Sequence, residues 1–310
     1  MNPLKIGVGL SQQADTTAAG RAAAEAALRQ AGLSRAAWAL CFFSADHLQG
    51  AEALRETLVA ETGCQALCGC SAGGVIAEGR EVQSGPALAV LLGQGGGLDA
   101  RSALLPQEGQ GMAAFGKGGQ TAGETSLLLV LPDAFQVNPI RLAEVAAEQM
   151  AGVPWFGAGA TDNGTVGIGL QMATESVRSR SVALLGFSGN FEIAVGITQS
   201  CTPLGEPRFI TAARENLLLE LDGRPALDTY LELGEQLGLE DIQGLAREVL
   251  FGFPIDAENP QFAGETCLVR GLSGLDRESG GLVVPFAPRS QTPLAFMHRN
   301  PLQAEEDMRR

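Results

Sequence analysis

The stretch Cys68-Gly69-Cys70-Ser71-Ala72-Gly73-Gly74 decides the fold of this chain, because it follows an apolar segment with an abrupt run of small residues. The preceding residues Gln65–Leu67 are typical of a strand, and the glycines predict that this strand ends or bends sharply. Glycine permits a positive φ and lets another group approach the backbone closely. Such a strand end offers amide groups, a hydroxyl and two thiols to a small polar or anionic molecule. The alternative is a tight turn between two core strands, in which Cys68 and Cys70 serve as small hydrophobic residues.

The same layout recurs later in the chain. The first copy consists of Leu40–Ser44, a helical pattern and the glycine turn Gly69–Gly74. The second consists of Leu128–Pro132, another helical pattern and a second glycine turn, Gly157–Gly164. A second similarity links Lys5–Gln12 with Glu192–Gln199. We therefore expect two quasi-repeated units, at about 1–95 and 125–190, with their glycine turns facing one cleft. Without any function, Asn163-Gly164 is also typical of a hairpin turn.

Strand order and glycine content predict an α/β (mixed α+β) fold with mixed sheets flanked by helices, built from two βαβ-plus-antiparallel units. The short strands expected at 75–76 and 86–92 follow each other directly, which favours antiparallel pairing. The glycine-rich segments 93–97 and 109–123 lack the Gly-Lys-Ser/Thr of a phosphate loop, so we interpret them as a connector between the units. The expected domains are 1–190 and 191–310.

Composition narrows the function classes. Lys and Arg number 21 against 35 Asp and Glu, and the net charge of −14 disfavours nucleic acid and membrane surfaces as partners. Six cysteines are too few for a disulfide scaffold in 310 residues, and their spacing with two histidines does not favour a metal site. We expect a protein with no metal and no cofactor. We also expect it to be cytoplasmic, since the N-terminus has no signal-peptide pattern.

Two motifs carry a family resemblance. Gly69–Ile76 and, more specifically, Glu220-Leu221-Asp222-Gly223-Arg224-Pro225-Ala226-Leu227-Asp228 are similar to the FIST sensory-domain family, with Cys201–Gly205 between them in the same order. The resemblance implies a FIST N-like domain, a FIST C-like domain and a sensor that binds a small molecule, amino acids having been proposed. In the family, a further strand-rich region follows a helix like Ala304–Asp307. Nothing here matches that region, so we expect an incomplete C-like domain.

The leading hypothesis is a sensory module without catalytic activity that binds a small polar ligand and signals to a partner protein in trans. Backbone amides of the first glycine turn would hold a carboxylate, Ser71 would donate a hydrogen bond and Asp162 would pair with an ammonium group. One alternative is an enzyme that uses Cys70 as nucleophile, activated by His47 or by the amides of the glycine turn. Another is a docking scaffold without ligand. The predicted ligand-binding residues are Gly69, Cys70, Ser71, Gly73, Gly74, Asp162, Asn163, Gly164 and Arg224.

Overall fold

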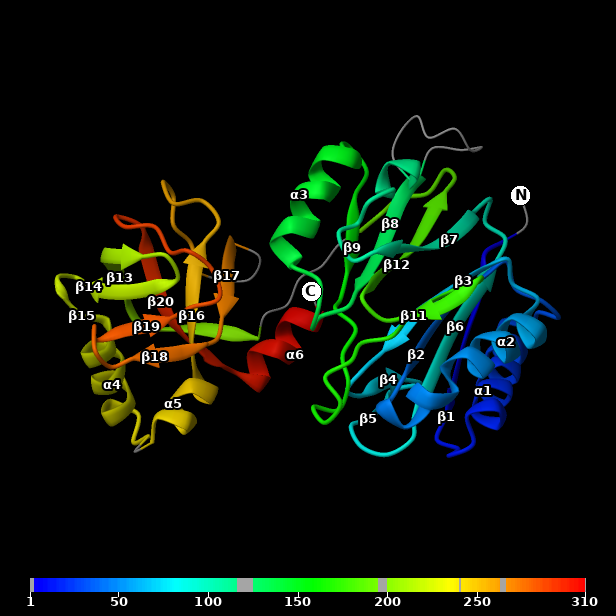
Figure 1. Cartoon of the computed structure of the whole chain (residues 1–310), viewed down its shortest axis with the longest axis horizontal. Coiled ribbons are helices and arrows are strands. Elements are labelled where there is room, and N and C mark those ends of the chain that lie inside the picture. The colour runs from blue at the N-terminus through cyan, green and yellow to red at the C-terminus, as the bar shows by residue number, and fades with distance from the viewer. Residues whose placement is uncertain (1–2, 116–124, 195–199, 240, 263–265, 310) are drawn as a thin grey trace. The chain divides into compact units, whose positions relative to one another are not determined.

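A computed structural model describes residues 3–115, 125–194, 200–239, 241–262 and 266–309. The chain divides into two compact units, Met1–Glu192 and Ile193–Arg310. They are called the N-terminal and C-terminal units below, and each is described by itself (Figure 1). Within the described residues, no helix has the length and apolar character needed to cross a membrane.

The N-terminal unit contains a first, mixed sheet of six strands. β1, β2 and β3 run in one direction, and β6 lies antiparallel between β1 and β2. β10 then pairs antiparallel with β3 and carries β11 at the edge. In order across the sheet, the strands are β1 (Lys5–Ser11), β6 (Leu88–Gln94), β2 (Trp38–Phe43), β3 (Ala66–Ser71), β10 (Gln171–Ala173) and β11 (Ser176–Arg178). A separate hairpin joins β4 (Val75–Ala77) to β5 (Arg80–Val82).

A second sheet of four strands belongs to the same unit. β8 and β9 are parallel neighbours, and β12 lies antiparallel between β8 and β7. The strands follow the order β7 (Asp99–Pro106), β12 (Ser181–Ser188), β8 (Thr125–Pro132) and β9 (Trp155–Gly157). The mixed α/β prediction is therefore confirmed.

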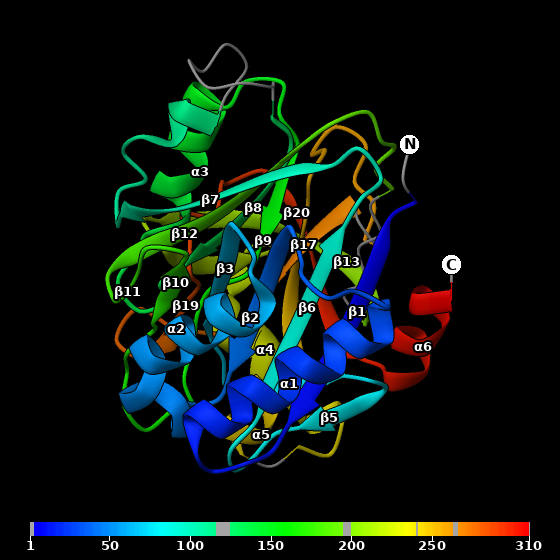
Figure 2. The same ribbon diagram turned by 90° about the vertical axis from the view of Figure 1, so that its right-hand side faces the viewer.

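Helices cover the outer faces of the two sheets (Figure 1). On the first sheet lie α1 (Thr16–Ala31), the short η1 (Ala45–Gly50) and α2 (Ala51–Thr62), and on the second lie η2 (Met112–Phe115) and α3 (Pro139–Gln149). Figure 2 shows α1 lying along β1 and β6. The helix can pack this closely because Gly7 and Gly9 have no side chain. A Cβ at either position would lie 2.0 Å from a backbone carbonyl oxygen of α1.

A further apolar cluster fills the space between the two sheets, which makes the unit a four-layer α/β/β/α sandwich. Strand alternation sends every second residue of each sheet into this layer and the others toward the helices. The buried members are Trp38, Ala66, Cys68, Cys70, Leu129, Leu131, Ala160, Ala183 and Leu185.

Three details differ from expectation. The strand before the first glycine turn includes Cys68–Ser71, and only Ala72–Gly74 separates it from β4, because Gly69 serves close strand packing within the sheet. The edge strand β7 lies between the two glycine-rich segments interpreted as a connector, and η2 lies within the second one, while residues 116–124 are outside the described part. The similarity of Lys5–Gln12 to Glu192–Gln199 also falls largely outside the described residues, since 195–199 are not described.

The C-terminal unit contains one sheet of eight strands together with helices. Its strands follow the order β17-β16-β20-β13-β14-β19-β18, with β15 paired to β14. Tyr230, Phe251 and Phe296 pack together in its core, with ring centroids 5.3 to 5.9 Å apart. The elements are β13 (Cys201–Arg214), β14 (Leu217–Leu221), β15 (Arg224–Pro225), α4 (Ala226–Gln236), α5 (Ile242–Glu248), β16 (Val249–Pro254), β17 (Cys267–Arg270), β18 (Gly274–Asp276), β19 (Gly281–Val283), β20 (Pro293–Arg299) and α6 (Pro301–Arg309).

Candidate functional site

The two glycine turns meet at the end of the first sheet. The Ser71 hydroxyl donates a 2.8 Å hydrogen bond to the carbonyl oxygen of Thr161 and accepts one of 3.0 Å from the Leu170 amide. The amide of Gly73 donates to the Thr161 hydroxyl at 3.0 Å. A Cβ on Gly73 would lie 2.8 Å from the Asp162 carbonyl oxygen. The turns are thus in direct contact, and their polar groups bond to each other.

Asp162 organises the loop of the second turn. Its carboxylate accepts hydrogen bonds of 2.6 to 2.8 Å from the amides of Gly164, Val166 and Gly167. Desolvation by itself would raise the pKa of Asp162, but the three amide bonds outweigh it and the pKa is lowered. Asn163 is exposed, and Gly164 has a φ of 81° in this loop rather than in a hairpin between adjacent strands. Asp162 therefore stabilises the conformation of this loop through hydrogen bonds to its backbone.

The first turn also differs from the role predicted for it. Ser71 has no exposed surface, and its hydroxyl donates within the protein, so the predicted hydrogen bond to a ligand is replaced by an internal one. Gly69 lies inside β3, where an added Cβ would come 2.3 Å from the Cys41 carbonyl oxygen. A Cβ on Gly74 would lie 2.8 Å from the Val82 carbonyl oxygen. These glycines serve close packing.

Cys70 lacks the surroundings of a nucleophile. It is buried in the layer between the sheets, and desolvation raises the pKa of its thiol to about 12. His47, the suggested base, lies in η1 with its Nδ1 atom 2.9 Å from the Thr16 hydroxyl, at the start of α1. Because α1 covers the opposite face of the first sheet, His47 and Cys70 lie on different sides of it.

Arg224, the remaining predicted residue, belongs to a tight turn in the C-terminal unit. Asp222 and Gly223 have φ values of 51° and 76° and connect β14 to β15 as a two-residue hairpin loop. Positive φ at both positions is the backbone of a type I′ turn, which Asp-Gly favours. Pro225 then occupies the position just before α4, so the motif Leu221–Ala226 sets where that helix begins.

The two charged residues of the turn each hold a second charged residue. The Asp222 carboxylate lies 3.3 Å from an Nη atom of Arg208, and Arg224 forms a two-pronged ion pair with Glu232. The Arg224 bond lowers the pKa of Glu232, which keeps that carboxylate ionised. The turn thereby fixes one cation on β13 and one anion on α4.

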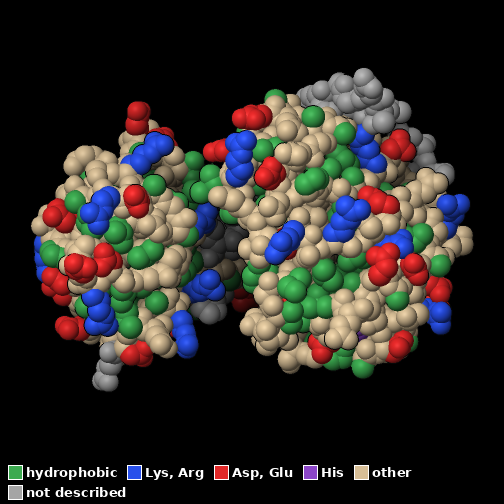
Figure 3. All heavy atoms as spheres, in the orientation of Figure 1, with side chains coloured by type: hydrophobic (Ala, Val, Ile, Leu, Met, Phe, Trp, Pro, Cys, Tyr) green, Lys and Arg blue, Asp and Glu red, His purple; other side chains and the backbone are tan. Residues whose placement is uncertain are grey.

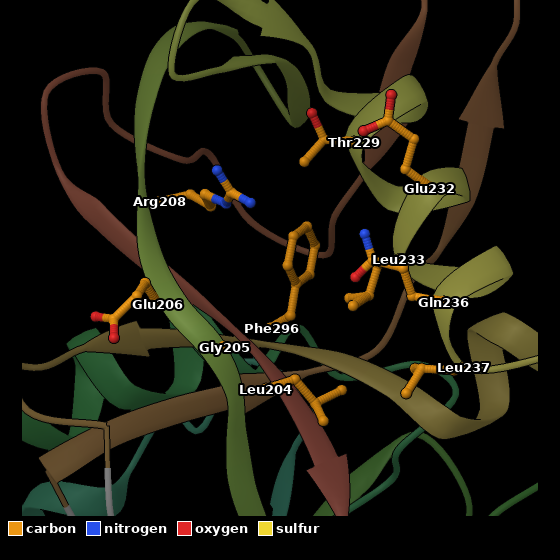
Figure 4. Close-up of a pocket in the computed structure, with 10 residues that line it drawn as sticks. All are labelled: Leu204, Gly205, Glu206, Arg208, Thr229, Glu232, Leu233, Gln236, Leu237 and Phe296. Carbon is orange, nitrogen blue, oxygen red and sulfur yellow. The ribbon is translucent and has the colours of Figure 1, made fainter.

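Arg208 and Glu232 line a pocket with a volume of about 350 Å³. In Figure 4 the Phe296 ring stands at its centre, with Arg208 on one side and Gln236 and Leu233 on the other. The Glu206 carboxylate points away from the ring. The complete lining is Leu204, Gly205, Glu206, Arg208, Thr229, Glu232, Leu233, Gln236, Leu237 and Phe296.

This arrangement offers a guanidinium group, a carboxylate and an amide around an apolar floor. Arg208 is half exposed, and its remaining donors are able to bind a second carboxylate. Sequence reasoning singled out Arg224 but missed Arg208 and Glu232. The only signal for them was the charged pair flanking Gly223, whose partners lie 14 and 8 positions away. Among the described residues, no His, Cys, Asp and Glu side chains gather in a way that would hold a metal ion.

Comparison with known proteins places this chain in a family. A family model described as the FIST N domain matches residues 37–224, a region that ends with the Asp222–Arg224 turn. An uncharacterized protein of Mycobacterium tuberculosis is 28% identical over 313 aligned positions, covering 99% of this chain and 79% of the relative. An uncharacterized protein of Mycobacterium bovis is 25% identical over 312 positions, with the same coverage. Because the family model matches more than half of the sequence, the chain belongs to the FIST family, whose domains generally serve in sensing and signal transduction.

Proposed function

We propose that this FIST protein is a sensor that binds a small zwitterion of the amino-acid class in the pocket beside the Asp222-Gly223 turn. The observation that carries the proposal is the pair of opposite charges at this pocket, Arg208 and Glu232, each held by a charged residue of the turn. An α-carboxylate would bind Arg208, and an α-ammonium group would bind Glu232. The apolar part of the ligand would pack on Phe296 and Leu233.

The size and chemistry of the pocket support a small ligand. A volume of about 350 Å³ lies at the lower end of the range for small-molecule sites, which is roughly 300 to 1,000 Å³. Pre-positioned ion pairs reduce the entropy lost when a charged ligand binds, because the side chains are already ordered. Gln236 adds an amide that both donates and accepts.

We propose binding rather than catalysis. The candidate nucleophile Cys70 is buried and its pKa is raised, so the reactive thiolate is disfavoured. A sensor without catalytic activity acts through a partner in trans. We place this activity in the cytoplasm, where the reducing environment keeps cysteine side chains as thiols.

A thermal-shift screen with the standard amino acids tests the proposal, followed by calorimetry on the largest shift. A ligand that binds only the folded state raises the melting temperature in a saturable way. The methyl ester of the same amino acid removes the carboxylate, and its N-acetyl derivative removes the ammonium group. We expect both derivatives to bind at least about tenfold more weakly, since each loses a charged contact.

Variants locate the binding site. Arg208→Gln and Glu232→Gln should each weaken amino-acid binding. The matched controls are Arg277→Gln and Glu258→Gln, at exposed residues outside the pocket, and they should leave the affinity unchanged. A ligand that binds equally well to Arg208→Gln overturns the placement. If no amino acid shifts the melting temperature, the ligand-free docking scaffold becomes the better interpretation.

A further inference from the structure

A second cavity of the C-terminal unit is an apolar groove between α4 and α5. It has a volume of about 490 Å³, larger than the pocket beside the Asp222-Gly223 turn. Leu231 at its edge is 41% exposed, so its side chain is accessible to a partner. Its lining is Leu231, Glu235, Gly238, Leu239, Asp241, Ile242 and Leu245.

The groove and the ligand pocket use different sides of α4. Leu231 and Glu235 line the groove, whereas Thr229, Leu233 and Gln236 line the pocket. Leu231 follows Thr229 by two positions, and two residues turn a helix by about 200°, so the two stripes point in nearly opposite directions. The face that borders the groove is therefore free of the ligand site.

The charged side chains that line the groove have one sign. Both ionisable residues that line it, Glu235 and Asp241, are exposed carboxylates. Over this part of the unit, Figure 3 shows exposed hydrophobic side chains alongside both acidic and basic side chains. The nearest cation in α5 is Arg247 in its last turn, which does not line the groove. An apolar groove with a negatively charged rim favours a partner whose surface combines apolar side chains with positively charged ones.

We propose that this groove docks an amphipathic helix of a partner protein, with lysine or arginine residues flanking an apolar stripe. A helix that lies in a groove anchors side chains at i, i+3, i+4 and i+7. The leucines and isoleucine would receive these anchors, and Glu235 and Asp241 would pair with the flanking cations. A second copy of this chain fits poorly, because each copy has a net charge of −14.

A synthetic helical peptide of about 18 residues tests the docking surface, with leucines at the anchor spacing and lysines elsewhere. Fluorescence anisotropy on the full chain, without any amino acid added, measures its affinity. A scrambled peptide of the same composition removes the apolar stripe, and a version with glutamate in place of lysine reverses the charge. We expect both to bind at least about tenfold more weakly, because each lacks one half of the complementarity.

Variants of the groove identify the contact. Leu231→Ser should weaken binding of the lysine peptide about tenfold. Leu268→Ser, at an exposed leucine on β17, should leave the affinity for the peptide unchanged. Glu235→Gln combined with Asp241→Asn should weaken binding and reduce its salt dependence. Asn keeps the cap that Asp241 provides to the Gly244 amide at 2.7 Å, so α5 stays intact.

Three results would overturn the proposal. The lysine peptide fails to bind, the scrambled peptide binds as well as the patterned one, or Leu231→Ser binds it as the wild type does. Each is independent of amino-acid binding, because the measurement uses the unliganded chain. A melting curve for every variant shows that a lost affinity is not a lost fold.

Discussion

The hydroxyl group of Ser71 donates a 2.8 Å hydrogen bond to the carbonyl oxygen of Thr161, 90 positions away in the chain. The bond joins the end of β3 in the first sheet to the loop that follows β9 in the second. The same hydroxyl accepts from the amide of Leu170, next to β10. Because β10 pairs with β3, this contact helps to hold β10 on the edge of β3 in the first sheet.

Replacing Ser71 with alanine should therefore destabilise the N-terminal unit. The change leaves the Leu170 amide and the Thr161 carbonyl group without this partner inside the protein, which costs about 1 to 3 kcal/mol. Urea unfolding at neutral pH measures the change in the free energy of unfolding. Ser84→Ala, at an exposed serine, is the matched control and should leave the midpoint unchanged. Equal stability of Ser71→Ala and wild type would contradict the structural role.

Gly69 and Gly157 occupy similar positions in the two sheets of the N-terminal unit. Each lies on the second strand of a parallel pair, opposite Cys41 in one sheet and Val130 in the other. A Cβ would come 2.3 Å from the Cys41 carbonyl oxygen at Gly69 and 1.7 Å from the Val130 carbonyl oxygen at Gly157. At both positions alanine cannot fit without moving the backbone.

Gly157→Ala should thus be strongly destabilising, by about 3 kcal/mol or more, since the clash is with backbone and not with a flexible side chain. Thermal melting of Gly157→Ala and Gly69→Ala, compared with wild type, checks the prediction. Gly271→Ala is the control, because its nearest atom would lie 3.9 Å away. A melting temperature within a degree or so of wild type for Gly157→Ala would show that the strands separate easily.

Sequence patterns predicted the mixed α/β fold and the glycine turns because local spacing determines both. Alternation of apolar residues identifies a strand, and glycine with proline marks its ends. The sequence did not reveal that β10 crosses to pair with β3, since strand partners are set by packing between distant segments. The edge strand β7 was missed for a related reason, because its residues are only partly buried and do not alternate clearly.

The candidate site was predictable only in part. The turn Asp222-Gly223 is visible in sequence, because Asp-Gly favours the left-handed backbone that both residues adopt. The partners Arg208 and Glu232 become visible only when β13 and α4 are folded around that turn. Ligand roles were predicted for Ser71 and Asp162 because they lie in the two glycine turns, which the quasi-repeat suggested would face one cleft. The fold instead supplies both side chains with partners from amides and carbonyl groups far along the chain or within the loop.

Acid should weaken the N-terminal unit through His47. The side chain is fully buried, and its Nε2 atom has no hydrogen-bond partner among the described residues. Desolvation lowers the pKa of His47 below 6.5, against the opposing effects of Asp46 and Asp15. The unfolded chain therefore binds a proton before the folded one does, and stability falls as the pH drops below about 6.5.

Urea unfolding between about pH 8 and pH 5 measures this effect. His47→Gln should show a shallower loss of stability over that range than wild type, even if it is less stable at pH 8. Ser84→Ala, at an exposed serine that does not titrate, is the control and should retain the wild-type slope. Parallel curves for wild type and His47→Gln would assign the pH dependence to other groups.

Asp222 has two separable roles, and two substitutions distinguish them. Asn tolerates the positive φ of this position but carries no charge for Arg208, whereas alanine loses both properties. We expect Asp222→Asn to keep most of the melting temperature and to weaken amino-acid binding, because Arg208 is no longer held. Asp222→Ala should lower both. If Asp222→Asn binds the amino acid as tightly as wild type, the orientation of Arg208 does not depend on this carboxylate.

Binding at the pocket should change binding at the groove, because both are lined by α4. A ligand that engages Glu232 and Gln236 restricts one side of the helix, whose other side presents Leu231 and Glu235. Take the amino acid that gives the largest melting shift. Linkage requires that it change the affinity of the lysine peptide by the same factor by which the peptide changes the affinity of that amino acid. Anisotropy titrations of the peptide, with and without saturating amino acid, give one factor, and calorimetry of the amino acid with and without peptide gives the other. Glu232→Gln should abolish the effect of the amino acid while leaving peptide affinity in its absence unchanged. If both ligands bind and neither affects the other, α4 separates two independent sites, and the signal must leave the pocket through β13 or β20 instead.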